Sequence, residues 1–171
     1  GTIIEGTSGN TGMGLAMAQQ LLQPTDTLLC ISRSEAPALQ GAADTAGCTL
    51  LQWQHDLADG AGAAERLREW LQRKSLDDFG SATLINNAGV LPRIAPLSES
   101  DADELTKALR VGLEAPMLLT SAFLGETEHW LVPRKVLNIS SGLGRRAMAS
   151  QAAYCAAKAG MDHFTRCAAL D

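Results

Sequence analysis

The sequence is poor in aromatic residues and contains no long apolar run. Only 4% of its 171 residues are Phe, Trp or Tyr, and there is a single tyrosine. No stretch of about 18 consecutive apolar residues occurs, so the sequence predicts no membrane-spanning helix. Stretches rich in Lys and Arg are missing as well, and the formal net charge is −5. Nucleic acid and an anionic membrane surface are therefore not expected as partners.

The cysteines also show no motif for a redox or metal site. The four cysteines form no C-x-x-C pair, and none lies at metal-ligand spacing from one of the three histidines. We therefore predict no metal site, and we expect small buried or half-buried thiols in a reducing compartment. The first residues show no basic stretch followed by an apolar core, so we expect a cytoplasmic protein. The cysteines are Cys30, Cys48, Cys155 and Cys167.

The composition is otherwise that of a globular protein with many small residues. Hydrophobic residues make up 46% of the chain, charged residues 19%, and there are 16 glycines. This balance excludes a disordered chain. The length fits a single domain over residues 1–171 with a substantial core.

Apolar runs alternate with helical patterns along the chain. Strands are predicted at residues 2–4, 27–32, 49–53, 82–85 and 135–139. Helices are predicted at 15–22, 35–47, 63–72, about 116–123 and 152–170, with one more that begins at Ser98 or Ser100 as the N-cap. Strands separated by helices indicate βαβ units. We therefore predict a three-layer α/β fold with a doubly wound parallel sheet.

A glycine-rich turn follows the first predicted strand and opens the first helix. Its sequence is Gly9-Asn10-Thr11-Gly12-Met13-Gly14. Such a turn lets backbone N–H groups approach a pyrophosphate, which the helix N-terminus also stabilises. A glycine cluster by itself is also compatible with a simple tight turn, but its position after the first predicted strand favours phosphate binding.

The second predicted strand ends at Ser32 and Arg33, where dinucleotide-binding folds often place an acidic residue. An acidic side chain there binds the ribose 2′-hydroxyl, whereas a cation and a small hydroxyl suit a 2′-phosphate. The pair therefore favours NADP(H) over NAD(H). The alternative is that Arg33 is an ordinary surface residue.

Tyr154 and Lys158 form the most informative pair in the sequence. Their i, i+4 spacing places both on one face of the last predicted helix. An ammonium beside a phenol stabilises the phenolate, so this tyrosine can exchange a proton with an alcohol or carbonyl oxygen. The Y-x-x-x-K spacing is common, however, and carries little weight alone. Ser140 and Ser141 follow the fifth predicted strand, where their hydroxyls can polarise a carbonyl or merely cap the next turn.

Taken in order, these motifs resemble the short-chain dehydrogenase/reductase family. The glycine-rich turn is followed by Asn86-Asn87-Ala88-Gly89, then by Ile139-Ser140-Ser141, and then by Tyr154 and Lys158. Ser141 precedes Tyr154 by 13 positions, which is the family's usual interval. The segments SATLINNAGVLP, KVLNISSG and AAYCAAKAGMDHFTRCAALD most resemble sepiapterin reductase-like and benzil reductase-like carbonyl reductases.

The resemblance implies a Rossmann-like domain that reduces a ketone or aldehyde with NADP(H), or catalyses the reverse oxidation. Tyr154 would be the general acid, Lys158 would assist it and hold the nicotinamide ribose, and Ser141 would bind the carbonyl oxygen. The family's oligomers further imply a homodimer or homotetramer, formed through the last helix and residues 113–123. The implied cofactor-binding residues are Ser8, Gly9, Asn10, Thr11, Gly12, Met13, Gly14, Ser32, Arg33, Asp56, Leu57, Asn87, Tyr154 and Lys158.

Three features depart from the family pattern. Ser8 stands where the first glycine of the turn belongs, unless a longer loop gives that role to Gly6, and Thr11 replaces a frequent basic residue. Gly112 stands where the family places an asparagine of the proton relay. The chain also ends one helix after Tyr154, about two-thirds of a usual chain, without the last strands. A catalytically impaired or non-catalytic dinucleotide-binding or scaffold protein is therefore the alternative function.

Overall fold

The computed structural model describes residues 2–7, 11–75 and 79–171. The predictions for Ser8, Gly9 and Asn10 lie outside these residues. Side-chain packing is described from residue 12 onward.

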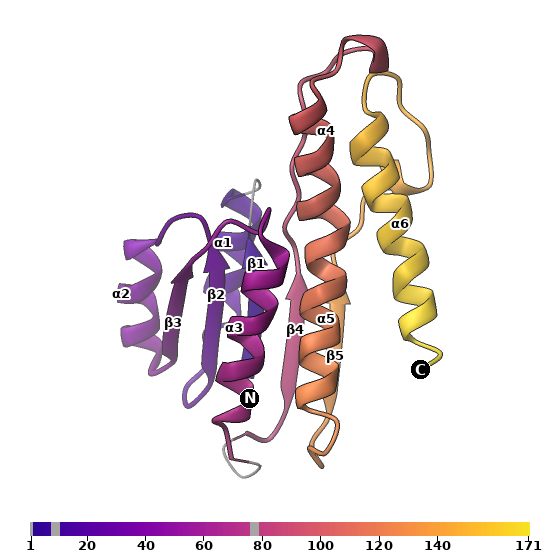
Figure 1. Cartoon of the computed structure of the whole chain (residues 1–171). Helices are drawn as coiled ribbons and strands as arrows, with labels where there is room; N and C mark the ends of the chain where they lie inside the picture. Colours follow the sequence, from indigo (N-terminus) through magenta and orange to yellow (C-terminus); the bar gives the residue numbers. More distant parts are fainter. Residues whose placement is uncertain (1, 8–10, 76–78) are drawn as a thin grey trace.

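Five parallel strands form one sheet in the order β3-β2-β1-β4-β5 (Figure 1). Their bounds are β1 Thr2–Thr7, β2 Thr27–Ser32, β3 Thr49–Gln54, β4 Ala82–Asn86 and β5 Arg134–Asn138. All five predicted strands are present, and β1 continues three residues beyond its predicted end. Strand order reverses at β1, which pairs with β2 on one side and with β4 on the other. Ligands of open α/β sheets bind beyond the carboxyl ends of the strands at such a point.

Helices connect the strands in the predicted alternation. Their bounds are α1 Thr11–Gln20, α2 Pro37–Ala46, α3 Gly60–Gln72, α4 Ala102–Leu109, α5 Ala115–Glu126 and α6 Ala152–Ala168. Short 3₁₀ turns lie at η2 Leu97–Glu99 and η4 Gly142–Gly144, and a π-helical segment, η3 Arg110–Glu114, joins α4 to α5.

Alternate residues of β2 face opposite sides of the sheet, and both sides are covered. Leu28 and Cys30 pack into a cluster with residues of α1 and α2. Leu29 and Ile31 pack into a larger cluster that contains Phe123 and other residues of α3 and α5. Figure 1 shows α3 and α5 in front of the strands and α1 behind them. A strand buried on both faces has a continuous apolar run in its sequence, as β2 does. The predicted three-layer, doubly wound fold is confirmed.

The segment from α4 to α5 forms one continuous rod beside α6 (Figure 1). The predicted N-cap at Ser98 or Ser100 is wrong, because the carboxylate of Asp101 caps α4 by accepting hydrogen bonds from the N–H groups of Asp103 and Glu104. Ser98 lies within the preceding 3₁₀ turn. Acidic residues serve as N-caps as well as serine does, so the sequence alone left the choice open.

Two expectations about the surface can be checked on the described residues. Cys30 and Cys48 are buried and Cys155 is half-buried, but Cys167 is exposed, so the expectation that all four thiols are at least half-buried is wrong. Cys167 lies on the outer face of the last turn of α6. Among the helices that the structure describes, none combines the length and apolar character of a membrane span.

Candidate functional site

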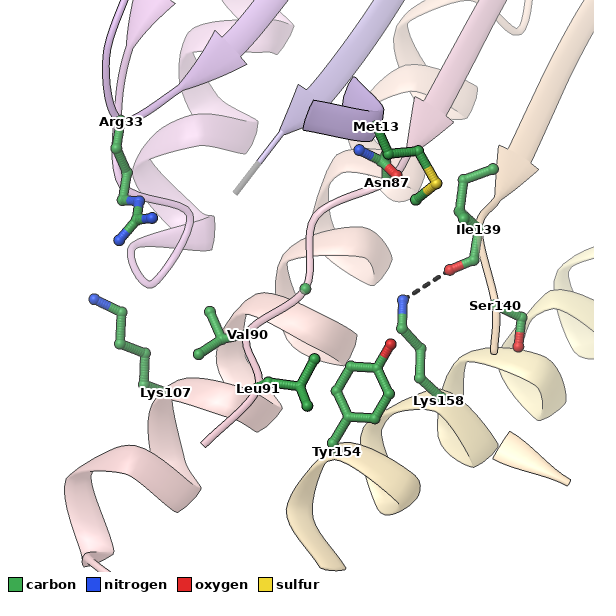
Figure 2. Close-up of a pocket in the computed structure, with 11 residues that line it drawn as sticks. Met13, Arg33, Asn87, Val90, Leu91, Lys107, Ile139, Ser140, Tyr154 and Lys158 are labelled. Carbon is green, nitrogen blue, oxygen red and sulfur yellow. Dashed lines mark hydrogen bonds between the residues drawn. The ribbon is translucent and has the colours of Figure 1, made fainter. Parts of the chain in front are cut away.

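A cavity of about 430 Å³ opens beyond the carboxyl ends of the strands (Figure 2). It lies at the reversal of strand order and draws its walls from α1, α4, α6 and the segments that follow β2, β4 and β5. The lining residues are Met13, Arg33, Asn87, Gly89, Val90, Leu91, Lys107, Ile139, Ser140, Tyr154 and Lys158.

Tyr154 and Lys158 project from one face of α6 into this cavity. Lys158 is only 3% exposed, and its Nζ donates a hydrogen bond of 2.7 Å to the carbonyl oxygen of Ile139. Nζ lies 5.9 Å from the centre of the Tyr154 ring, and the phenolic hydroxyl points toward it (Figure 2). Burial lowers the pKa of Lys158 below its ordinary value, and the negative charge of Asp162 opposes that shift. The pair thus places a phenolic hydroxyl near a desolvated lysine amine.

The segment after β4 packs its backbone against this pair. A Cβ on Gly89 would lie 3.7 Å from Lys158 Nζ and 3.8 Å from Cε2 of Tyr154. Asn87 is 4% exposed, and neither atom of its amide group has a hydrogen-bond partner among the described residues. Buried amides are nearly always hydrogen-bonded in folded proteins. Asn87 therefore presents both a donor and an acceptor that a ligand in the cavity can satisfy.

The two serines after β5 occupy different surroundings. Ser140 lines the main cavity, whereas Ser141 faces an adjoining depression that it shares with Ser140, Gly142 and Arg145. The Oγ of Ser141 accepts a hydrogen bond of 3.2 Å from the N–H of Leu143, as an N-cap of the short η4 turn. The capping role that the sequence allowed is thus confirmed for Ser141, and the polarising role stays a prediction.

Charged residues gather at the other end of the cavity. Asp56 Oδ1 accepts a hydrogen bond of 3.0 Å from the N–H of Ala58, and Asp56 Oδ2 lies 3.1 Å from Lys107 Nζ. The hydrogen bond from Ala58 lowers the pKa of Asp56, partial burial opposes it, and the charges of Lys107 and Arg33 lower it further. Ser32 donates a hydrogen bond of 2.7 Å from Oγ to the carbonyl oxygen of Ser34.

The structure brings together five of the residues predicted to bind the cofactor: Met13, Arg33, Asn87, Tyr154 and Lys158. Leu57 is 1% exposed and packs in the core, and it does not line the cavity. Gly12 is exposed in the first turn of α1, whereas Gly14 is buried there.

Sequence reasoning missed several residues of the cavity. Val90 and Leu91 directly follow the Asn-Asn-Ala-Gly motif, so extending that motif by two positions would have found them. Lys107 carries no local signal, because it belongs to a helix that reaches the site only through the fold.

Gly112 lies within the π-helical segment and allows α6 to approach closely. A Cβ at this position would lie 3.0 Å from the Cβ of Ala157, the residue that precedes Lys158. The family pattern expects an asparagine here. Gly112 supplies no side-chain hydrogen bond, and it instead provides the space in which Ala157 packs.

The fold and this site define an α/β protein of the dinucleotide-binding class with a paired tyrosine and lysine. The short chain dehydrogenase family profile matches residues 3–171. The chain therefore belongs to the short-chain dehydrogenase family, a family of oxidoreductases, and the resemblance predicted from its motifs is confirmed.

Individual relatives agree with this assignment. The chain is 36% identical to a benzil reductase ((S)-benzoin forming) of Bacillus cereus over 99% of its own residues and 67% of that enzyme, so it spans about two thirds of that relative. A short-chain dehydrogenase/reductase from Burkholderia vietnamiensis superimposes with a TM-score of 0.84 at 36% identity, covering 99% of this chain and 79% of that one. A metagenomic short-chain oxidoreductase in complex with NADP gives 0.81 at 27% identity, covering 98% and 74%.

Proposed function

We propose that this protein is an NADP(H)-dependent carbonyl reductase. The observation that supports it most is the placement of Tyr154 and Lys158 in a cavity whose other end holds Arg33 and Lys107. One end of the cavity thus offers proton transfer to an oxygen atom, and the other end offers binding of an anion. A reduced dinucleotide with an additional phosphate has the matching chemistry at its two ends.

The residues present fit such a cofactor. The buried amide of Asn87 has an unused donor and an unused acceptor, as expected for a group that meets ribose hydroxyls. The first turn of α1 presents backbone N–H groups that have no acceptor within the helix itself, and a helix N-terminus suits a pyrophosphate. When bound, the nicotinamide supplies the hydride for the reduction.

Proton transfer is the task of Tyr154. As hydride reaches the carbonyl carbon, the phenol donates its proton to the carbonyl oxygen. The ammonium of Lys158, held by the carbonyl oxygen of Ile139, stabilises the phenolate that remains. In this proposal the hydroxyl of Ser141 donates a hydrogen bond to the substrate oxygen, while its Oγ still accepts one from the N–H of Leu143.

The substrate we propose is an aromatic diketone or ketone, with benzil as the probe. The name of the Bacillus cereus relative supports this class. Val90 and Leu91 provide an apolar wall close to Tyr154 in the cavity (Figure 2). An apolar wall favours a substrate whose substituents are rings rather than charged groups.

We also propose that the protein assembles as a homodimer or homotetramer. An apolar groove of about 380 Å³ lies on the outer side of the α4–α5 rod, and Leu109 and Met117 in it are 41% and 44% exposed. Contiguous exposed apolar surface of this kind marks an interaction site. Size-exclusion chromatography with light scattering tests the assembly, and a monomeric result would contradict it.

The activity is tested by following the absorbance of NADPH in the presence of benzil. We expect turnover by the wild-type protein and a loss of about 10²–10⁴-fold in Tyr154→Phe, which keeps the ring but lacks the proton. Calorimetry with NADPH is the control, because the variant should still bind the cofactor. Cofactor binding without turnover in the wild type would instead favour the non-catalytic alternative that Gly112 suggests.

A further inference from the structure

Lys107 lines the cavity but takes no part in the proposed transfer of hydride and proton to the substrate. It lies in α4, far along the sequence from the other charged residues of the site, and it lines the end of the cavity opposite Tyr154. Figure 2 shows Lys107 and Arg33 at this end, each with its charged group extended into the space between them.

The two cations share a single carboxylate. Lys107 Nζ lies 3.1 Å from Asp56 Oδ2, and the charge of Arg33 also acts on Asp56. Glu104, one of the two carboxylates of α4, accepts a hydrogen bond of 3.0 Å from the N–H of Arg93. Two cations, Lys107 and Arg33, thus act on the one carboxylate of Asp56.

The bond between Lys107 and Asp56 is easily exchanged. The two side chains are 40% and 42% exposed, and ion pairs exposed to this extent contribute little to stability. Asp56 also keeps a second partner in the N–H of Ala58. A flexible lysine stem can therefore redirect its ammonium from Asp56 to a more highly charged anion at small cost.

We propose that Lys107 is a second 2′-phosphate-binding residue, which acts with Arg33 on the adenosine end of the cofactor. This inference rests on the proposed function, and it adds a specificity residue on α4 to the pair that follows β2. A phosphate monoester carries a charge between about −1.5 and −2 at neutral pH, so two cations neutralise it better than one. Arg33 supplies a planar group with fixed donors, and Lys107 supplies a mobile point charge.

Lys107 has one alternative role, that of orienting Asp56, and the two roles predict different binding results. If Lys107 only orients Asp56 for contact with the adenine base, its removal weakens every adenine nucleotide equally. If it binds the 2′-phosphate, its removal weakens only the nucleotides that carry this group. Adenosine 2′,5′-bisphosphate and 5′-AMP differ by that phosphate alone, so the two probes separate the roles.

The experiment is calorimetric titration of both probes into wild-type protein, Lys107→Met and Arg33→Met. We expect Lys107→Met to weaken binding of the bisphosphate by about tenfold or more, as for loss of one charge-assisted hydrogen bond, with 5′-AMP changed by less than about twofold. Arg110→Met is the matched control, because Arg110 lies one turn further along, 4.0 Å from Glu114, and does not line the cavity. It should leave both affinities unchanged.

The outcomes separate this inference from the proposed function. Equal weakening of both probes, or no effect of Lys107→Met, overturns the 2′-phosphate role. Failure of the wild type to bind either probe overturns it too, whether or not benzil is reduced. Selective loss of bisphosphate binding, in a protein that does not reduce benzil, supports the inference and contradicts the proposed activity.

Discussion

The ammonium nitrogen of Lys158 donates a hydrogen bond of 2.7 Å to the carbonyl oxygen of Ile139, the residue that follows β5. This bond joins α6 to the end of the sheet and holds the lysine 3% exposed beside Tyr154. A charged group kept so far from water destabilises the fold unless its interactions compensate. Because burial lowers the pKa of Lys158, these interactions do not fully compensate for the lost hydration of its charged form.

Lys158→Met should therefore remove the energetic penalty of the buried charge and, at the same time, reduce activity. In the wild type, the lysine pKa is lower in the folded than in the unfolded state, so the folded protein binds protons less readily. The penalty is fully present below the folded pKa and disappears as pH rises toward the ordinary value of 10.5. Wild-type stability should consequently rise relative to the variant between neutral pH and pH 10.5. Benzil reduction should fall by at least about 10²-fold.

Urea unfolding at a series of pH values measures the difference in unfolding free energy between the two proteins. Lys135→Met is the matched control, because Lys135 lies exposed on β5, and its removal should give no such trend. A difference between wild type and Lys158→Met that stays constant with pH would contradict the argument.

Asp162→Asn should move the alkaline limit of activity to lower pH. Asp162 lies one turn beyond Lys158 on α6, its side chain is 13% exposed, and its charge raises the Lys158 pKa. Without this charge, Lys158 loses its proton at lower pH and no longer stabilises the phenolate of Tyr154. The pH dependence of kcat for benzil reduction measures the shift.

Arg145→Met is the control for Asp162→Asn, because it removes the partner of Asp162 but keeps the Asp162 charge. Arg145 Nε lies 3.7 Å from Asp162 Oδ2, so its loss leaves the Asp162 charge in place and less compensated. The alkaline limit should then stay where it is or rise. A shift to lower pH in both variants would indicate that the pair acts by holding the turn after Ser141 rather than through its charge.

Local patterns sufficed to predict the strands, most helices and the Tyr154–Lys158 pair. The central strand β2 is buried on both faces and is a plain apolar run, and the two residues of the pair lie about one helical turn apart. The environment of Lys158 was beyond such patterns, because the carbonyl oxygen of Ile139 reaches it only through the packing of α6 on β5.

The roles of Lys107 and Gly112 could not be predicted from local sequence patterns either. Lys107 reaches Asp56 across 51 positions of sequence, and no periodicity in α4 distinguishes it from a solvated lysine. In the sequence, Gly112 indicates only the loss of the asparagine side chain that the family pattern expects. In the structure, its missing Cβ leaves the space in which Ala157 packs. Each contact joins two helices or loops that are distant in the sequence, and a sequence pattern describes each of these elements only by itself.

Asn86→Ala should destabilise the fold by about 1–3 kcal/mol, because it leaves two acceptors without their donor. The side-chain nitrogen of Asn86 donates to Thr120 Oγ1 at 3.1 Å and to Asn138 Oδ1 at 2.8 Å. The amide of Asn138 donates in turn to Thr165 Oγ1 at 2.8 Å. This network ties the last residues of β4 and β5 to α5 and α6.

Urea unfolding followed by tryptophan fluorescence measures the loss. The double variant Asn86→Ala/Asn138→Ala should lose less than the two single variants combined, because each single change already breaks their shared bond. Strict additivity would show that the network does not act as a unit.

Gly60→Ala and Gly41→Ala should have opposite effects on stability. A Cβ on Gly60, at the start of α3, would lie 2.9 Å from Cα of Ala115, so α3 and α5 must separate, at a cost of about 1–3 kcal/mol. Gly41 lies inside α2, exposed, with no atom within 4 Å of the new Cβ. Alanine should stabilise that helix by about 0.5–1 kcal/mol. Thermal unfolding compares the two, and a Gly60→Ala protein as stable as the wild type would show that the contact between α3 and α5 adjusts freely.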